Sequence, residues 1–167
     1  VFRELSPDSA QLADDAASLR SAYVHIPFCR RRCPYCDFAV VTPDEGGTPY
    51  TVTRYVQAVI AEIGMERPWA PLDAVNVGGG TPSSLPPSAL AAILDALKRR
   101  FGVASDAEIS LEANPEDWDG EYAEAMRTIG FNRVSLGVQS FDAEVLRALG
   151  RNHTPRQAIS AIRRSQA

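Results

Sequence analysis

Residues 23–38 have the sequence YVHIPFCRRRCPYCDF, in which a short apolar segment leads into a loop that holds all three cysteines of the 167-residue chain. An odd number of cysteines cannot form a closed set of disulfides. In a reducing compartment, thiols this close in sequence indicate metal ligation or redox chemistry. This segment therefore predicts both the start of a sheet and the place of its chemistry.

The spacing of Cys29, Cys33 and Cys36 lets three thiolates bind one small inorganic centre. Three protein ligands leave one iron of a [4Fe-4S] cluster free for an external ligand, whereas structural zinc usually takes four. His25 is a candidate fourth ligand for zinc, although it lies on the strand before the loop. Three alternatives stay open: an iron–sulfur cluster, a structural zinc loop and adjacent free thiols.

Outside this loop, short apolar runs alternate with helical patterns, which is typical of a parallel α/β sheet built from strand–helix units. Strands are predicted at 23–26, 74–77, 108–113 and 133–139. Helices are predicted at 53–66, from the N-cap Ser88 to Gly102, at 120–129, from the N-cap Asp142 to Leu149, and from Thr154-Pro155 onward.

A closed eight-unit barrel needs about 250 residues, and four strands alone would leave an unpaired edge. We therefore expect residues 22–167 to be the amino-terminal part of a longer barrel. Residues 1–21 are rich in Ala, Asp and Ser without a clear apolar period, and we expect a loosely ordered leader there.

The composition, with 45% hydrophobic and 23% charged residues, fits a globular unit with its own core. A net charge of -4, with one dense basic spot at 30–32, argues against nucleic acid or an anionic membrane as the main partner. The chain has no apolar run of about 18 residues, and residues 1–20 lack the features of a signal peptide. We therefore expect a cytoplasmic protein.

The CxxxCxxC spacing, with an aromatic residue before the last cysteine, resembles the radical SAM superfamily. The longer string at 23–38 is more specific and resembles the oxygen-independent coproporphyrinogen III oxidase family, in particular its heme chaperone branch, HemW. The resemblance runs from about Tyr23 to Ala158. It implies a partial (β/α)6 barrel, of which about four strand–helix units are present, with a [4Fe-4S] cluster on the three cysteines beside S-adenosylmethionine.

The run Gly78-Gly79-Gly80-Thr81-Pro82 follows the second predicted strand. Glycines let a ligand approach the backbone closely, and their N–H groups can bind a carboxylate, although a tight turn also needs glycine. By resemblance to the family, Gly79, Gly80 and Thr81 hold the methionine moiety of S-adenosylmethionine.

The resemblance assigns five more contacts with this cofactor, namely Tyr23, Tyr35, Glu112, Gln139 and Arg151. Glu112 and Gln139 end two predicted strands and so point into the same mouth of the sheet as the cysteine loop. The family pairs the acid with the amino group of the cofactor and places the tyrosine between the cysteines against its adenine. Strand-end polar residues are otherwise caps or solvated rim. We expect Asn114 and His153 to be structural.

The resemblance implies one-electron reduction of the cofactor by the cluster, giving methionine and a 5′-deoxyadenosyl radical. Two functions then compete. Oxidases of the family decarboxylate two propionates of coproporphyrinogen III, whereas the chaperones hold heme and deliver it to respiratory proteins. The oxidases carry a fourth cysteine two residues after the third, where this chain has Phe38.

We therefore favour a heme chaperone, with heme or porphyrin and heme-accepting respiratory proteins as partners. Whether the chain has enzyme activity stays open. A zinc-stabilised interaction domain, which needs no organic cofactor, is the third alternative.

Overall fold

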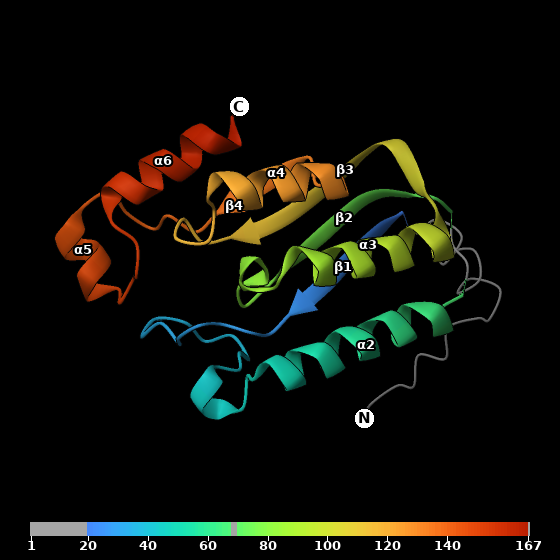
Figure 1. Ribbon diagram of the computed structural model, residues 1–167, viewed down its shortest axis with the longest axis horizontal. Helices are drawn as coiled ribbons and strands as arrows, with labels where there is room; N and C mark the ends of the chain where they lie inside the picture. Colours follow the sequence, from blue (N-terminus) through green and yellow to red (C-terminus); the bar gives the residue numbers. More distant parts are fainter. Residues whose placement is uncertain (1–19, 68–69, 167) are drawn as a thin grey trace, which may run out of the picture.

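The computed structural model describes residues 20–67 and 70–166, and its four strands form one sheet in the order β1-β2-β3-β4 (Figure 1). The strands are β1 (Ser21–Ile26), β2 (Leu72–Gly79), β3 (Val103–Ala113) and β4 (Arg133–Leu136). Each strand pairs in parallel with the next. The predicted parallel sheet of strand–helix units is confirmed.

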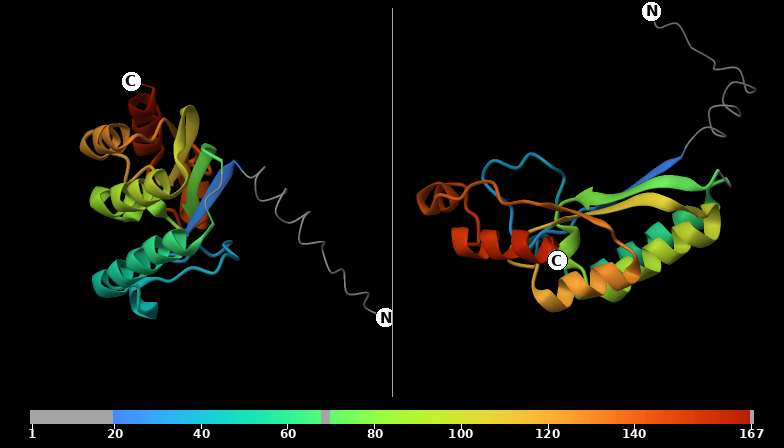
Figure 2. Two further views of the ribbon diagram at one scale, coloured as in Figure 1. Left: turned by 90° about the vertical axis from the view of Figure 1, so that its right-hand side faces the viewer. Right: turned by 90° about the horizontal axis from the view of Figure 1, so that it is seen from above.

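The helices are α2 (Pro49–Met65), α3 (Pro87–Phe101), α4 (Gly120–Ile129), α5 (Ala143–Ala148) and α6 (Pro155–Ser165). Two short 3-10 turns, η1 (Pro43–Glu45) and η2 (Pro82–Ser84), lie in the loops after β1 and β2. Helices α2, α3 and α4 cover the same face of the sheet (Figure 2). This is the arrangement that right-handed parallel crossovers produce.

The core lies between the sheet and these helices. Alternate strand residues, Val24 and Ile26 on β1 and Val75 and Val77 on β2, are almost fully buried against the helices. Helix α3 contributes the predicted apolar stripe of Leu90, Ile93, Leu94, Leu97 and Phe101. Each such side chain gains about 1.5–3 kcal/mol from burial, so this layer holds the sheet in place.

The opposite face of the sheet is polar. Parallel register pairs Tyr23 with Asn76 and Asn76 with Ser110, and Asn76 Nδ2 donates to Ser110 Oγ at 2.9 Å. Glu112 lies on the same face, two residues beyond Ser110 along β3. This face leads toward the carboxyl edge of the sheet, where the cysteine loop begins.

Several predicted helix ends are confirmed. The Asp142 side chain accepts from Glu144 N and Val145 N at the start of α5. Thr154 forms a capping box at the start of α6, and Gly102 ends α3 with a φ of 77°. Each of these signals acts within one helical turn, so the local sequence suffices to place it.

Other predicted ends are wrong. Ser88 is not the N-cap of α3, because the helix begins at Pro87, whose fixed φ favours the first helical position, and Pro86 precedes it. Helix α2 begins at Pro49, four residues before the predicted start, with the Thr48 side chain accepting from Thr51 N. Strand β2 continues through Gly79, whereas β4 ends at Leu136 instead of 139.

The expected leader, residues 1–21, lies outside the described residues apart from Arg20 and Ser21, and Ser21 begins β1. Of the helices in the part of the chain that the structure describes, none has the length and hydropathy needed to cross a bilayer.

Candidate functional site

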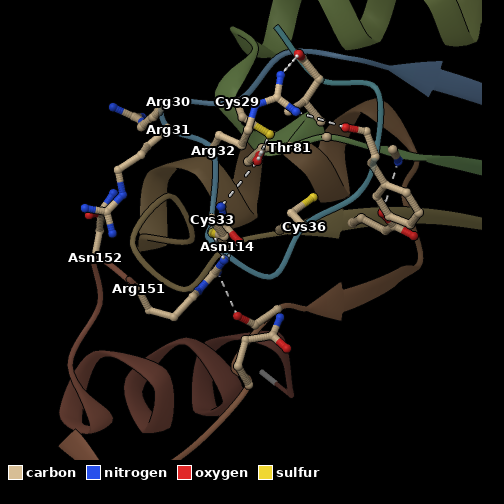
Figure 3. Close-up of a pocket in the computed structure, with 18 of the residues that line it drawn as sticks. Cys29, Arg30, Arg31, Arg32, Cys33, Cys36, Thr81, Asn114, Arg151 and Asn152 are labelled. Carbon is tan, nitrogen blue, oxygen red and sulfur yellow. Dashed lines mark hydrogen bonds between the residues drawn. The ribbon is translucent and has the colours of Figure 1, made fainter. Parts of the chain in front are cut away.

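A cavity of about 290 Å³ opens at the carboxyl edge of the sheet, lined by loops that follow all four strands and by the segment after α5 (Figure 3). The predicted site residues in its lining are Cys29, Cys33, Tyr35, Cys36, Gly79, Gly80, Thr81, Glu112, Gln139 and Arg151. Parallel strands bring their carboxyl ends to one edge, which explains why residues so distant in sequence meet here.

The cysteine loop is closed at its base by backbone pairing. Phe28 forms an isolated parallel bridge with Val41; Cys29 N donates to Val41 O at 3.1 Å, and Val41 N donates to Pro27 O at 2.8 Å. Phe28 is buried, and its ring packs edge-on against Tyr55 of α2 at 5.4 Å. The core therefore fixes the position of Cys29.

Arg32 stabilises the same loop from within. Its guanidinium donates to the carbonyls of Phe38, at 3.2 Å, and Val40, at 2.7 Å. The Glu45 carboxylate of η1 lies 3.1 Å from Arg32 Nη2. These contacts hold the segment after Cys36 in a defined path.

The three cysteines are free thiols, and each is half-buried in the cavity lining. Among residues 20–67 and 70–166, no group of three or more His, Cys, Asp or Glu side chains is arranged to hold a single metal ion. A four-iron cluster sets a different requirement, because each thiolate binds its own iron. Three thiols around one cavity, with no fourth cysteine among the 167 residues, therefore fit a [4Fe-4S] cluster that keeps one iron open.

The protein around Cys29 favours the thiol over the thiolate, because burial outweighs the hydrogen bond from Thr81 in its effect on the pKa. Burial raises the pKa of the Cys29 thiol, whereas the hydrogen bond that it accepts from Thr81 lowers this pKa. Bound iron carries positive charge and favours the thiolate over the thiol.

The glycines at the end of β2 permit close approach to the cysteine loop. A Cβ atom on Gly80 would lie 2.8 Å from Phe28 O and 3.0 Å from Cys29 Sγ. Gly79 has a φ of 114°, which side chains rarely adopt, and a Cβ atom there would also contact the His25 ring at 2.7 Å. Residues with side chains at these positions would force the loops apart.

The N–H groups of Gly79, Gly80 and Thr81 already have acceptors within the protein. Gly80 N donates to Ile26 O at 2.7 Å, and Thr81 N donates to Phe28 O at 2.8 Å. Gly79 N donates to Glu112 Oε2 at 3.1 Å. The run therefore continues the pairing of β1 with β2 and holds the Glu112 carboxylate at the cavity.

Gln139 lines the cavity although β4 ends three residues before it. It is the one non-glycine residue with positive φ, at 64°, among the residues that the structure describes. Left-handed backbone is uncommon for residues other than glycine and often marks functional positions.

Arg151 lies between the cysteine loop and the end of β3. Its Nη1 donates to Cys33 Sγ at 3.5 Å and to the Tyr35 hydroxyl at 3.4 Å. Its Nη2 donates to Gly137 O at 2.9 Å and to Asn114 Oδ1. Arg151 is therefore a structural link as well as a candidate cofactor contact.

Tyr23 does not line the cavity, unlike the other predicted residues. It is 60% exposed, and its hydroxyl lies 3.2 Å from His25 Nδ1. Burial raises the pKa of the Tyr23 phenol, and the nearby charge of Glu112 raises it further. Tyr23 thus lies on the same face of the sheet as Glu112, level with Ser110, which precedes Glu112 by two residues.

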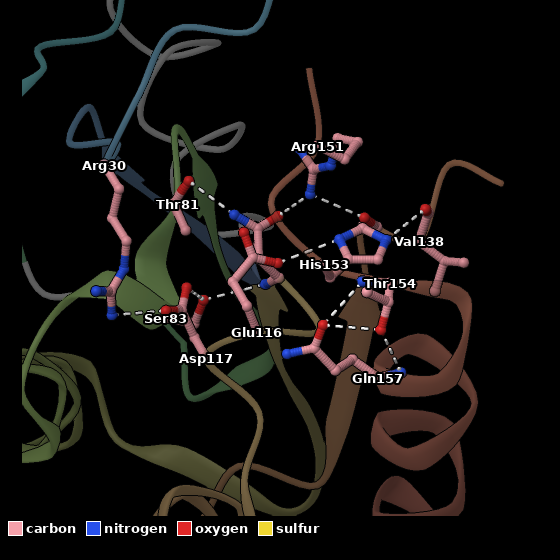
Figure 4. A network of polar contacts seen from close by, with 12 residues as sticks. Arg30, Thr81, Ser83, Glu116, Asp117, Val138, Arg151, His153, Thr154 and Gln157 are labelled. Carbon is pink, nitrogen blue, oxygen red and sulfur yellow. Dashed lines mark hydrogen bonds and ion pairs between the residues drawn. The ribbon is translucent and has the colours of Figure 1, made fainter. Parts of the chain in front are cut away.

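The structure adds residues that the sequence did not single out (Figure 4). Asp117 has a side chain only 2% exposed and forms an ion pair with Arg30 of the cysteine loop, at 2.7 Å, without hydrogen-bond geometry. Ser83 donates to Asp117 at 3.0 Å and accepts from Asn114 N at 3.1 Å. These contacts join the loops that follow β1, β2 and β3.

His153 has the structural role that we expected, with partners that the sequence did not reveal. Its side chain is fully buried and lies between Glu116, at 3.2 Å from Nδ1, and Val138 O, at 2.9 Å from Nε2. It therefore joins the start of α6 to the segments after β3 and β4 (Figure 4).

Comparison with known proteins identifies the family to which a chain with this fold and cysteine loop belongs. Residues 23–167 match the model of the Radical SAM superfamily. The chain is 46% identical, over 148 residues, to the heme chaperone HemW of Synechocystis sp.. This match covers 85% of this chain and 36% of the relative. It is 42% identical, over 167 residues, to the heme chaperone HemW of Mycobacterium tuberculosis. This match covers 96% of this chain and 42% of the relative.

A solved structure, the coproporphyrinogen III oxidase HemN from Escherichia coli, described as a radical SAM enzyme, superimposes with a TM-score of 0.82 at 28% identity. The match covers 95% of this chain and 38% of HemN, so the chain spans about two-fifths of the proteins that it matches. The chain therefore belongs to the Radical SAM superfamily, and within it resembles the HemW heme chaperones of the coproporphyrinogen oxidase-like family.

Proposed function

We propose that the full-length protein carries a [4Fe-4S] cluster on Cys29, Cys33 and Cys36, binds S-adenosylmethionine beside it, and delivers heme to target proteins. The observation that carries the choice of a chaperone is Phe38, which lines the rim of the cavity and is 64% exposed. By resemblance, oxidases of the family have a cysteine here. This chain has an apolar ring at that position instead of a thiol.

When bound to the three cysteines and reduced by an external electron donor, the cluster would supply one electron to the sulfonium of the cofactor. The residues of this chain orient that cofactor. The Glu112 carboxylate, fixed by Gly79 N, faces the cavity and suits an ammonium group. Arg151 suits a carboxylate, and the Tyr35 ring, between two cluster ligands, offers a surface for adenine.

We expect Glu112→Ala to weaken S-adenosylmethionine binding by about 1.5–3 kcal/mol, because a hydrogen bond between charged groups has this value. The iron content should not change, because Glu112 makes no hydrogen bond to a cysteine sulfur among the residues that the structure describes. Calorimetry on the reconstituted full-length protein measures the affinity.

Glu112→Gln is the matched variant. It keeps an acceptor for Gly79 N but removes the charge, so its affinity should lie between those of the wild type and Glu112→Ala. Equal affinities for all three proteins would show that Glu112 is a rim residue and that the cofactor binds elsewhere.

An oxygen-independent coproporphyrinogen III oxidase is the second candidate, supported by the match to HemN. The two functions differ in their products. A chaperone should bind heme and leave coproporphyrinogen III unchanged when cluster, cofactor and reductant are supplied. Formation of protoporphyrinogen IX well above a cluster-free control would contradict the chaperone. This experiment needs the full-length protein, because the relatives are more than twice as long as this chain.

We further propose a cytoplasmic location and respiratory heme proteins as recipients. Transfer of heme from the loaded protein to an apo-cytochrome, followed by absorbance, tests the recipients, and cell fractionation tests the location. The zinc-stabilised domain remains a third proposal. Iron, sulfide and zinc analysis of anaerobically purified protein distinguishes it, since zinc without sulfide would support a zinc loop and contradict the cluster.

A further inference from the structure

Two of the three cysteine sulfurs accept hydrogen bonds from residues outside their own loop. Thr81 Oγ1 donates to Cys29 Sγ at 3.3 Å, and Arg151 Nη1 donates to Cys33 Sγ at 3.5 Å. Thr81 is 6% exposed, so little solvent competes at its hydroxyl.

Asn114 connects the two donors. Its Nδ2 donates to Thr81 Oγ1 at 3.4 Å, and its Oδ1 accepts from Arg151 Nη2. The contacts form a chain from Cys29 through Thr81, Asn114 and Arg151 to Cys33 (Figure 3). A side chain with no direct contact to either sulfur thus lies at the centre of the network.

The chemistry of the groups fixes the direction of every bond in this network. Arginine has donors but no acceptor, so the atom of Asn114 that faces Arg151 must be the carbonyl oxygen. The amide NH₂ must then face Thr81 and occupy a lone pair of its hydroxyl oxygen. The hydroxyl hydrogen is left to point at Cys29 Sγ. Asn114 therefore determines which way Thr81 donates.

The backbone of Asn114 is itself held in place. Asn114 N donates to Ser83 Oγ at 3.1 Å, and Ser83 donates to the buried Asp117 carboxylate at 3.0 Å. The backbone of Asn114 and both ends of its side-chain amide are therefore held in place. Such preorganised groups lose little conformational entropy when the charge on the sulfurs changes.

We propose that Asn114 is a positioning residue that directs Thr81 and Arg151 at the cluster thiolates, and that this network raises the reduction potential of the cluster. Reduction adds negative charge that is shared with the ligand sulfurs, and hydrogen bonds to those sulfurs stabilise the reduced state more than the oxidised state. The inference rests on the cluster of the proposed function but not on heme or on any substrate.

The test is an anaerobic redox titration of the reconstituted full-length protein, without S-adenosylmethionine, followed by electron paramagnetic resonance of the reduced cluster. Thr81→Val removes the hydroxyl at nearly constant shape, and Asn114→Leu removes both amide contacts. We expect each variant to have a lower potential, with the ratio of reduced to oxidised cluster falling on the order of threefold to tenfold at a fixed poise. A tenfold change corresponds to about 59 mV for one electron.

The double variant separates a positioning role from independent effects. If Asn114 acts on Cys29 through Thr81, then Thr81→Val combined with Asn114→Leu should shift the potential no further than Asn114→Leu alone. Strictly additive shifts would contradict the network. Thr81→Ser, which keeps the hydroxyl, should restore the wild-type potential.

Ser84→Ala is the matched control. Ser84 donates to Thr81 O at 2.6 Å in the same turn but contacts no cysteine sulfur in the described hydrogen bonds. Its potential should equal that of the wild type, and a shift as large as that of Thr81→Val would mean that loosening of the turn is the cause. Unchanged potentials in Thr81→Val and Asn114→Leu, at full iron content, would overturn the inference and leave the heme chaperone proposal intact.

Discussion

Replacing Cys33 with serine is expected to abolish the iron–sulfur cluster. All three cysteines of the 167 residues lie in one loop, so no other thiolate within these residues can take over the lost ligand. Serine is a poor ligand for cluster iron, and two thiolates hold the cluster weakly. After anaerobic reconstitution, the variant should contain iron and sulfide at the level of a protein treated with chelator and should lack the brown absorbance.

Asp37→Asn is the control for this experiment. Asp37 is exposed, directly follows Cys36 and is not part of the cavity lining, so its substitution changes the loop without changing a ligand. That variant should load fully. Full iron content and normal absorbance in Cys33→Ser would contradict the assignment of the cluster to these three cysteines.

Local rules predicted much of the fold. The bounds of α4 and the caps Asp142 and Thr154 depend on residues within one helical turn, and the structure confirms them. The position of Ser88 shows the limit of such rules. A serine before an apolar stripe is a good cap in isolation, but Pro87 already has the backbone angle of a first helical residue, so α3 starts before Ser88.

A topological rule predicted most of the site. Because strands of a parallel sheet end at the same edge, Gly79, Glu112 and the cysteine loop were expected to meet, and they line one cavity. Gln139 also lies there although β4 ends three residues before it, and its backbone is left-handed. Tyr23 does not reach the cavity, since it pairs with Asn76, three residues before the end of β2.

Contacts between distant loops were beyond the sequence pattern. Asn114 and Thr81 are 33 residues apart, and Ser83 and Asp117 are 34 residues apart. No periodicity or short motif relates such positions, and their pairing depends on how far each loop extends beyond its strand. An asparagine before a proline is typical of a turn. Asn114 was therefore assigned to a turn, and its contacts with Thr81 and Arg151 were not predicted.

The ion pair between Arg30 and Asp117 gives the second large effect. We expect Arg30→Ala to lower the free energy of unfolding by about 3 kcal/mol at pH 7.5, because it leaves a buried carboxylate without its counter-charge. The Asp117 side chain is 2% exposed, whereas that of Arg30 is 64% exposed, so this value lies at the lower end of the range for buried pairs. Urea unfolding of the cluster-free protein, followed by tryptophan fluorescence, measures it.

This loss of stability should depend on pH, with a sign that the burial of Asp117 determines. Burial raises the pKa of Asp117, the charge of Glu116 adds to that rise, and Arg30 and Ser83 oppose it. A carboxyl whose pKa is higher in the folded state favours folding below its unfolded pKa and loses that contribution as pH rises through the folded pKa. Removing Arg30 raises the folded pKa of Asp117 further, so the loss of stability should be larger at pH 7.5 than at pH 5.5.

Arg133→Ala is the control, because it breaks an exposed pair with Glu108. There we expect a change in the free energy of unfolding below about 1 kcal/mol at both pH values. An equal loss for Arg30→Ala at the two pH values would mean that lost packing of the arginine, and not the buried charge of Asp117, explains its effect.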